Sequence, residues 1–157
     1  MLRIGKLTDY ATGLMAQLAH SPQRNVSAQQ LALELGLPGP TVGALLKRLG
    51  RAGLVRSVRG AGGGYGLARA PREISVADVI VAIEGPVALT ECALGEGNCK
   101  LESGCATRGN WQRISHAVQV ALEAVSLADL AAPAGTTARA VKFPDLPGAA
   151  AQGDVHG

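Results

Sequence analysis

Residues 37–67 read LPGPTVGALLKRLGRAGLVRSVRGAGGGYGL and decide the fold of this chain. Pro38 and Pro40 cannot continue a preceding helix, because they have no N–H to donate. Pro40 does suit the first turn of a new helix, where that N–H would have no intrahelical partner. The new helix covers about residues 40–52 and ends at Gly53, and the helical period predicts a buried face formed by Val42, Leu45, Leu46 and Leu49.

A short β-hairpin is predicted directly after this helix. Residues 54–58, LVRSV, alternate apolar and polar side chains, which is the pattern of a half-buried strand. The glycine-rich residues 60–64 form a tight turn, and residues 65–67 return as the second strand. These glycines do not form a phosphate-binding loop, because they lie between two strands and do not open a helix.

Two further helices are predicted before this segment. Residues 27–35 begin with Ser27 followed three positions later by Gln30, the spacing of a capping box, and Gly36 ends that helix. Residues 8–20 carry an apolar face formed by Tyr10, Ala11, Leu14 and Leu18. Helices joined by a tight Gly/Pro turn and followed by a hairpin are typical of a winged helix-turn-helix. The predicted fold class is therefore mainly α with a small β-hairpin.

Downstream of the hairpin the pattern is helical again. Residues 75–84 form a capped helix. Residues 110–125 form a long helix, and a short turn at residues 126–130 is predicted to extend it. The single apolar stripe of the long helix is made of Trp111, Ile114, Val118, Leu122 and Val125. Residues 131–157 are rich in Ala, Gly, Pro and Thr without a period, which predicts a disordered tail.

Charge divides the chain more sharply than its net value of +3 suggests. Residues 1–72 hold 10 Lys or Arg against 2 Asp or Glu, residues 73–130 hold 3 against 8, and residues 131–157 hold 2 against 2. A basic half favours a nucleic-acid partner. We therefore predict a DNA-binding domain at 1–72, a second, acidic region at 73–130, and the tail at 131–157.

Basic residues gather on the predicted recognition helix and on the hairpin, which would be the wing. Short polar and cationic side chains on a helix can contact base edges in the major groove. Arg59 leads into the glycine turn, a position suited to a narrow minor groove. Exposed Arg48 and Arg51, taken alone, are more typical of a solvated helix face. The predicted DNA-binding residues are Ser27, Pro40, Thr41, Lys47, Arg48, Arg51, Arg56, Arg59 and Tyr65.

Three cysteines, Cys92, Cys99 and Cys105, have the spacing C-x6-C-x5-C in a glycine-rich, acidic loop. That spacing is wider than the CxxC pairs of zinc knuckles. Cysteine thiolates hold iron–sulfur clusters, in some cases with one ligand of another type. Three thiols without a metal are the alternative, although such a polar loop is a poor place for hydrophobic burial. Residue types that could supply a fourth ligand occur at Asp9, Glu91, Glu96, Glu102, Asn110 and His116.

Several classes of protein are excluded. No apolar run reaches the ~18–20 residues of a transmembrane helix, and the first residues lack the pattern of a secretory signal. A cytoplasmic location without a membrane partner is therefore expected, where structural disulfides are rare. No catalytic triad, Cys/His pair or paired carboxylates are evident, so neither an enzyme nor a small-molecule substrate is predicted. Aromatic residues make up only 3% of the chain, which disfavours RNA and favours double-stranded DNA.

The chain resembles the Rrf-type bacterial transcription regulators, the family with IscR-like and NsrR-like members. The resemblance covers residues 1 to about 130. It depends on RAGLVRSVRGAGGGYGLAR at 51–69, on LTDYAT at 7–12, on the helix pair at 27–52 and on the three-cysteine loop. Within the family, the stretches TDYAT, GLPGPTV, EGPVALTEC and GNWQRI look most like the proteobacterial regulators of SUF iron–sulfur assembly genes.

This resemblance implies that residues 73–130 are a cysteine-loop sensing and dimerisation region. It implies a homodimer in which the helix at 107–125 pairs with its mate and each protomer reads one half-site of a DNA operator. It implies that the three cysteines bind a [2Fe–2S] or [4Fe–4S] cluster and that Arg59 enters the minor groove. NsrR-like members use an aspartate of the first helix, supplied by the other subunit, and Asp9 matches that position. IscR-like members carry a His where this chain has Arg108 and a carboxylate where it has Gly43, so cluster type and operator sequence do not carry over.

The resemblance thus predicts a repressor of SUF genes that senses cluster status. Two alternatives stay open. A thiol-redox or zinc-stabilised winged-helix repressor would keep the fold and lack the iron–sulfur cluster. An iron–sulfur assembly accessory protein would carry a cluster and have no affinity for DNA.

Overall fold

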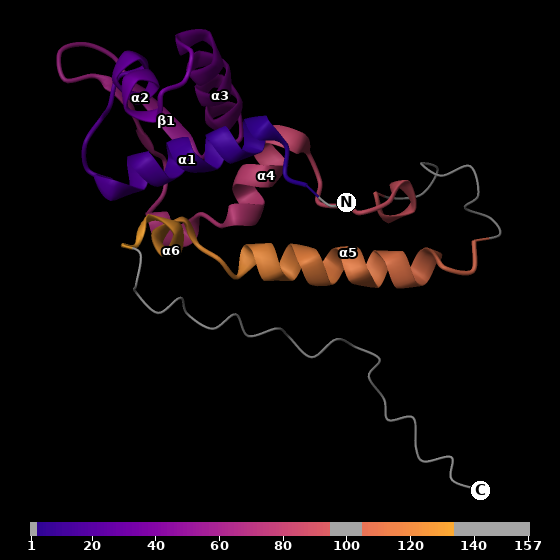
Figure 1. Ribbon diagram of the computed structural model, residues 1–157. Coiled ribbons are helices and arrows are strands. Elements are labelled where there is room, and N and C mark those ends of the chain that lie inside the picture. Colours follow the sequence, from indigo (N-terminus) through magenta and orange to yellow (C-terminus); the bar gives the residue numbers. More distant parts are fainter. Residues whose placement is uncertain (1–2, 95–104, 134–157) are drawn as a thin grey trace, which may run out of the picture.

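The computed structural model describes residues 3–94 and 105–133 (Figure 1). Its elements in chain order are α1 (Lys6–His20), α2 (Ala28–Leu35), α3 (Gly39–Arg51), β1 (Val55–Val58), β2 (Gly64–Leu67), η1 (Pro71–Glu73), α4 (Val76–Glu84), η2 (Glu91–Ala93), α5 (Arg108–Glu123) and α6 (Leu127–Ala131). Helices α1–α4 and α6 and the hairpin form one body, and α5 extends away from it. Among the described residues, no helix combines the length and the hydrophobicity needed to cross a membrane. The predicted fold class, mainly α with a small β-hairpin, is confirmed.

The body holds one hydrophobic core, because each amphipathic helix turns its apolar stripe inward. The predicted inner face of α3 is confirmed, since it buries Val42, Leu45, Leu46 and Leu49. The same core includes Ala11, Leu14, Met15 and Leu18 of α1. It also continues past residue 72, where it takes in Ile74, Val79, Ile83 and Leu127. The change in charge between residues 72 and 73 therefore falls inside a continuous core.

Helix α6 is a separate element, so the prediction that it extends α5 was wrong. The Ser126 hydroxyl caps α6 by accepting a hydrogen bond from the N–H of Asp129 at 3.2 Å. The N–H of Leu127 donates to the carbonyl of Ile74 at 2.8 Å, and the Leu127 side chain is buried in the body. The chain turns back because this apolar side chain gains more contacts in the core than it would on an extended helix. The predicted tail lies outside the described residues from position 134 onward.

Strands β1 and β2 pair antiparallel, with Val55 opposite Leu67 and Val58 opposite Gly64. The alternation predicted along the first strand was wrong. Leu54 and Val55 are both buried, and the rest of β1 is exposed, including Val58 at 38%. The turn of the hairpin projects away from the helices (Figure 1), so Val58 beside it lies outside the core, whereas Val55 and Leu67 at the base belong to the core and Tyr65 packs against it.

Two helix caps test the predicted capping boxes. Ser27 does cap α2, because its hydroxyl accepts from the N–H of Gln30 at 3.1 Å. The side-chain amide of Gln30 donates to Glu34 at 2.8 Å instead of reaching back, so this box is only half formed. The i, i+4 spacing on an exposed helix face favours that pair. In α4 the box is complete, because Ser75 and Asp78 each accept from the other's backbone N–H.

Helix α1 begins without a capping side chain of its own. Glu84, the last residue of α4, takes this role, because its carboxylate accepts from the N–H of Gly5 at 3.0 Å and from the hydroxyl of Thr8. A carboxylate at a helix N-terminus also opposes the positive end of the helix dipole. The bond to Gly5 spans 79 positions of sequence and fixes the start of α1 to the end of α4.

Candidate nucleic-acid interface and cysteine segment

Helix α3 presents the predicted recognition surface. Its inner face is in the core, which leaves Lys47 and Arg51 exposed and Thr41 half-buried near the N-terminal end. Pro40 is exposed in the first turn, as expected for a residue without an N–H. Two cations thus stand on the outer face of a helix, an arrangement that fits the width and the negative charge of a major groove.

A groove of about 590 Å³ lies between α3 and the hairpin. Gly43, Lys47 and Gly50 are among the α3 residues that line it. The two glycines have no side chains, so of these three residues only Lys47 contributes a side chain to the wall of the groove. The remaining lining residues are Leu46, Arg51, Val55, Ser57 and Tyr65. The groove therefore separates the two elements that are predicted to contact DNA.

The turn of the hairpin requires its glycines. Gly60 and Gly64 have φ values of +94° and +138°, which residues with a side chain rarely adopt. A Cβ at Gly63 would lie 2.4 Å from the carbonyl oxygen of Val58, closer than real atoms approach. Arg59 is exposed directly before this turn, so it stands at the tip of the wing, where it was predicted.

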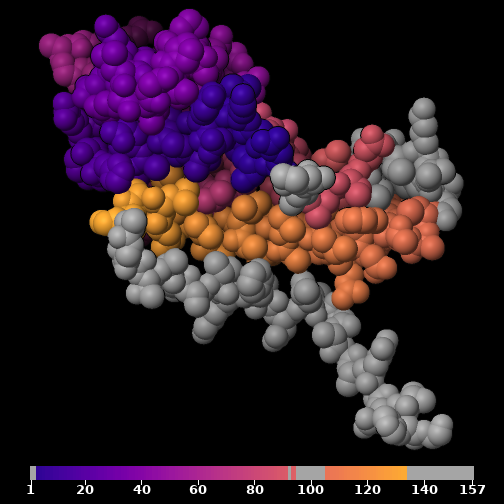
Figure 2. All heavy atoms as spheres, viewed as in Figure 1, coloured from indigo at the N-terminus to yellow at the C-terminus, as the bar shows by residue number. Residues whose placement is uncertain are grey.

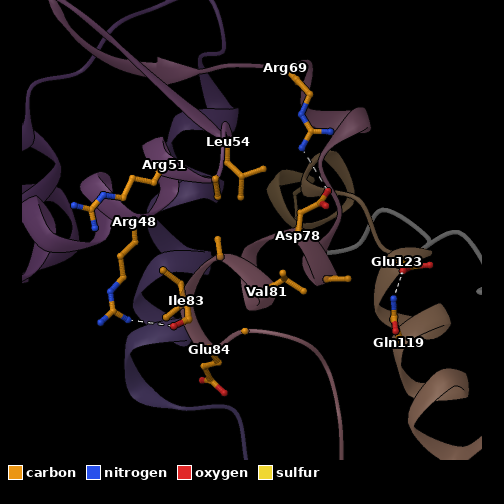
Figure 3. A pocket seen from close by; sticks show the side chains of 14 residues that line it. Arg48, Arg51, Leu54, Arg69, Asp78, Val81, Ile83, Glu84, Gln119 and Glu123 are labelled. Atoms are coloured by element: carbon orange, nitrogen blue, oxygen red, sulfur yellow. Dashed lines mark hydrogen bonds and ion pairs between the residues drawn. The ribbon is translucent and has the colours of Figure 1, made fainter. Parts of the chain in front are cut away.

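Two of the predicted DNA-binding arginines contact other parts of the body. Arg56 Nε donates to the carbonyl of Leu67 across the hairpin at 3.1 Å. Arg48 Nη1 donates to the carbonyl of Ile83 in α4, also at 3.1 Å (Figure 3). Helical and strand periods could not reveal these bonds, because each partner lies on another element.

Ser27 and Tyr65 lie where the second strand of the wing meets the segment that precedes α2. The backbones of Val26 and Tyr65 exchange two hydrogen bonds, of 2.9 and 2.8 Å. Asn25 Nδ2 also donates to the carbonyl of Gly62 at 3.3 Å. These bonds attach the wing to the start of α2. The sequence interpretation missed Asn25, and the preference of Asn for turns was the only signal that could have pointed to it.

The described residues around the first and third cysteines, 91–94 and 105–107, lie toward the end of α5 that is far from the body (Figure 1). Cys92 belongs to η2, and Cys105 shortly precedes α5. Helix η2 packs against α5, and the N–H of Leu89 donates to the buried hydroxyl of Ser115 at 3.1 Å. Cys99 lies outside the described residues. The segments that carry Cys92 and Cys105 therefore lie at the same end of α5.

The environment of Cys105 favours its thiolate. The Thr107 hydroxyl lies 3.4 Å from Sγ. This hydrogen bond, together with the backbone of Thr107 and Arg108 and the positive charge of Arg108, holds the pKa of the Cys105 thiol below that of an ordinary cysteine. Partial desolvation opposes the shift and is outweighed. A thiolate is the form of cysteine that binds metals and attacks disulfides.

Asp9 lies in another part of the molecule, exposed in the first turn of α1. It borders a groove of about 510 Å³ lined by α1, α4 and α6. Asp9 belongs to α1 and Cys105 precedes α5. Within one chain, α1 is part of the body, whereas α5 begins at the end that is far from the body (Figure 1). In residues 3–94 and 105–133, no three His, Cys, Asp or Glu side chains gather as a metal site would require. Of the other predicted ligands, Glu91, Asn110 and His116 are exposed, and Glu96 and Glu102 lie outside the described residues.

This geometry defines the class of the protein. A helix-turn-helix with a hairpin wing, and with cations on the outer face of its second helix, is the fold of a DNA-binding transcription regulator. The chain belongs to the Rrf2 family, described as an iron-dependent transcriptional regulator, which it matches over residues 4–133. The resemblance seen in the sequence is confirmed. Members of this family are regulators and not enzymes, as predicted.

Relatives and solved structures agree with this membership. A putative HTH-type transcriptional regulator of Azotobacter vinelandii is 38% identical over 124 residues, which are 78% of this chain and 75% of the relative. The fold is similar to CymR, the global cysteine regulator of B. subtilis, with 33% identity and a TM-score of 0.68 over 83% of this chain and 97% of CymR. It is similar to IscR of T. potens, with 33% identity and a TM-score of 0.64 over 82% of this chain and 85% of that one.

Proposed function

We propose that this chain is a cytoplasmic, homodimeric repressor of SUF-type iron–sulfur assembly genes that senses cluster status through a bound iron–sulfur cluster. One observation carries the proposal: the predicted sensing and reading parts lie at the two ends of a connected set of helices. The segments of Cys92 and Cys105 lie at the far end of α5, whereas α3 and the wing lie in the body (Figure 1). Helix α4 packs against both α5 and α3.

In this proposal, α3 enters the major groove of a double-stranded operator and the wing approaches the minor groove. The major groove is wide enough for a helix and distinguishes all four base pairs. Lys47 and Arg51 would contact this groove or its phosphates, and Arg59 at the wing tip would enter the minor groove. The other proposed contacts border the same two elements and are Ser27, Pro40, Thr41, Arg56 and Tyr65.

A second copy of the chain is the proposed partner of α5. Trp111 and Ile114 belong to the apolar stripe of α5 and are 40% and 45% exposed. Ser115 is the one residue of α5 that is buried by the described part of the chain. Burying such a stripe against a second helix is favourable. A dimer would place its two α3 helices about one helical turn of DNA apart, ~34 Å, or a multiple of it.

Cys92, Cys99 and Cys105 are the proposed cluster ligands, with Asp9 of the partner subunit as the fourth. The lowered pKa of Cys105 fits a thiolate donor. The separation of Asp9 from the far end of α5 within one chain fits a ligand that comes from the other protomer. When bound, a [2Fe–2S] or [4Fe–4S] cluster would link the thiolates to one another. The presence of this link would depend on the supply of iron and sulfide and on the redox state.

Regulation would follow from linkage between the two sites. A cluster changes operator affinity only if the protein binds it better in one arrangement of the two α3 helices than in another. Couplings of this kind are typically about 1–3 kcal/mol, a change of about 5–150-fold in affinity. Helix α5 would transmit the change to α3 through α4, against which both helices pack.

Purification without oxygen tests the cluster. The protein should be brown and contain iron and acid-labile sulfide, and chelation of the iron should change its operator affinity. Cys105→Ser should lose the iron, whereas Arg113→Ala, an exposed change on α5, should keep it. A colourless protein with stoichiometric zinc would contradict the cluster and leave the DNA-binding function intact.

The ligand role of Asp9 has its own test. Asp9→Ala should alter the absorption spectrum of the cluster, because a different fourth ligand changes the electronic structure of the iron. Glu34→Ala removes an exposed carboxylate of α2 and serves as the control. An unchanged spectrum in Asp9→Ala would exclude Asp9 and direct the search to Asn110 and Glu91.

A thiol-redox regulator is the second candidate, and the lowered pKa of Cys105 favours it. The similarity to CymR, described as the global cysteine regulator of B. subtilis, supports the same candidate. It predicts that an oxidant reversibly changes operator affinity in protein free of iron and zinc, which the cluster proposal does not. Membership in the Rrf2 family counts against the third alternative, an iron–sulfur assembly accessory protein without affinity for DNA.

A further inference from the structure

Arg48 joins the recognition helix to α4. The side chain leaves the last turn of α3, and its Nη1 donates to the carbonyl oxygen of Ile83 at 3.1 Å (Figure 3). The bond is partly buried and connects residues 35 positions apart. It lies at a pocket of about 810 Å³ where the end of α3, α4 and α5 meet, with Gln119 and Glu123 on the α5 side.

The acceptor is well matched to a cation. Ile83 belongs to the last turn of α4, whose carbonyl groups lack the N–H partners that a continuing helix would supply. The same turn is the negative end of the helix dipole, which favours a positive charge. A guanidinium that donates to this carbonyl satisfies an acceptor and places its charge at the favourable end of α4.

Lys47 shows the contrast within the same turn of α3. Lys47 and Arg48 are consecutive, so their side chains point about 100° apart around the helix. Lys47 lines the groove that faces the wing, whereas Arg48 lines the pocket that faces α4 and α5. The proposed operator would lie on the side of α3 that Lys47 faces, and not on the side that Arg48 faces.

The residue next to the acceptor fixes a second helix. Glu84 accepts from Gly5 and Thr8 at the start of α1, one position after the carbonyl that holds Arg48. The last turn of α4 thus binds α3 through Ile83 and α1 through Glu84. Since α4 also packs against α5, helix α4 connects the proposed dimerisation helix with the recognition helix.

We infer that Arg48 is a positioning residue, which sets the orientation of α3 by holding it to the last turn of α4 and does not contact DNA. The inference rests on the proposed function, in which α3 reads the operator. It replaces the prediction from the sequence that Arg48 belongs to the DNA-binding set. Loss of the bond should reduce operator affinity because α3 is held less firmly, not because a phosphate contact is lost.

The salt dependence of binding separates these two causes. Arg48→Met and Lys47→Met each remove one positive charge from α3 and add the same unbranched side chain. Each phosphate contact contributes about 0.9 to the slope of log affinity against log salt concentration. Lys47→Met should lower that slope by about 0.9, whereas Arg48→Met should weaken binding about tenfold with the slope unchanged. An equal loss of slope in Arg48→Met would overturn the inference.

Hydrogen exchange in the absence of DNA tests the bond itself. The amide of Gly85 donates to the carbonyl of Val81 in the last turn of α4. It should exchange several-fold faster in Arg48→Met and at the original rate in Lys47→Met. An unchanged rate in Arg48→Met would also overturn the inference. If the wild-type protein does not bind duplex DNA, the proposed function fails, and the exchange rate still decides whether Arg48 holds α4. Arg48→Gln allows the same measurements if Arg48→Met does not fold.

Discussion

The body and α5 bury their apolar residues to very different extents. In the body, α1–α4 and α6 share one continuous core, whereas in α5 only Ser115 is buried by the described residues. Trp111 and Ile114 of α5 stay 40% and 45% exposed. The space-filling view shows α5 running out beyond the body (Figure 2). The body therefore has its own core within one chain, although Leu7, Leu33, Val81 and Leu130 remain exposed on its surface. Helix α5 has no such core and keeps an exposed apolar stripe, which a second copy of the chain would cover in the proposed dimer.

Charge separates the same two regions. The basic residues of positions 1–72 include Lys47 and Arg51 on the outer face of α3 and Arg59 at the wing tip. The acidic excess of positions 73–130 includes Glu91, directly beside Cys92. Negative charge there repels DNA phosphates, and it also costs free energy if an anionic cluster is bound nearby. The basic region therefore has the charge that suits DNA, whereas the charge of the acidic region keeps DNA away and does not favour the proposed cluster.

Breaking the stripe of α5 should have the largest effect. Trp111→Asp places a charge in the proposed dimer interface, where removal of a central aromatic residue typically costs 2 kcal/mol or more. The dimer dissociation constant should rise about 100-fold, and operator affinity should fall with it. Light scattering after size exclusion measures the first and a binding titration the second.

A matched change on the other side of α5 is the control for this experiment. His116→Asp introduces the same charge at an exposed position off the apolar stripe and should leave the dimer intact. A dimer that survives Trp111→Asp would remove the stripe from the interface, and the body would then have to supply the contact between protomers.

Changing the wing tip should have the next largest effect. Arg59→Ala should weaken operator binding about tenfold and lower the salt slope by about one, as expected for loss of one charged contact to DNA. Arg72→Ala removes the same charge from η1, outside α3 and the wing, and should change neither quantity by as much. Equal behaviour of the two variants would mean that the net charge of the body, and not the position of Arg59, determines binding.

The thiol of Cys105 allows a smaller change to be measured at the other end of the molecule. Thr107→Val removes the hydroxyl that stabilises the thiolate, so the pKa of Cys105 should rise toward that of an ordinary cysteine. The thiolate fraction at neutral pH should fall, and alkylation by iodoacetamide should slow several-fold. The rate is measured against pH with Cys92 and Cys99 replaced by Ser. Thr107→Ser keeps a hydroxyl and should react like the wild type; an unchanged midpoint in Thr107→Val would contradict this account.

Two glycines with free space around them give the smallest effect. A Cβ at Gly43 of α3 or at Gly13 of α1 would have no neighbour within 4 Å. Each change to Ala should raise the free energy of unfolding by about 0.5–1 kcal/mol, since Gly is the poorer helix former. Only Gly43→Ala should also change operator affinity, because Gly43 lines the groove beside the wing. Equal operator affinities in the two variants would place this groove outside the DNA interface.

The sequence was sufficient to predict structure where a helix is capped by a residue a few positions away and where the buried residues repeat with the helical period. The caps by Ser27 and Ser75 depend on residues three positions away, and the inner face of α3 repeats with the helix. It was insufficient for Gln30, which pairs with Glu34, and for Val58, which the projecting hairpin carries away from the core. For Gln30, the hydrogen bond to Glu34 replaced the one that the capping pattern predicts. For Val58, no core surface is close enough for the side chain to pack against.

The sequence by itself determined the order of the elements, the winged helix-turn-helix and the three cysteines, because periodicity, capping residues and turn glycines act over a few positions. Only the tertiary structure decided that Arg48 and Glu84 meet the last turn of α4 and the start of α1, respectively. The contacts of Arg48 and Glu84 join residues tens of positions apart, and they exist because packing of a shared core brings the ends of separate helices together. The tertiary structure also decided that α1, which carries Asp9, and the start of α5, which follows Cys105, lie in different parts of one chain (Figure 1).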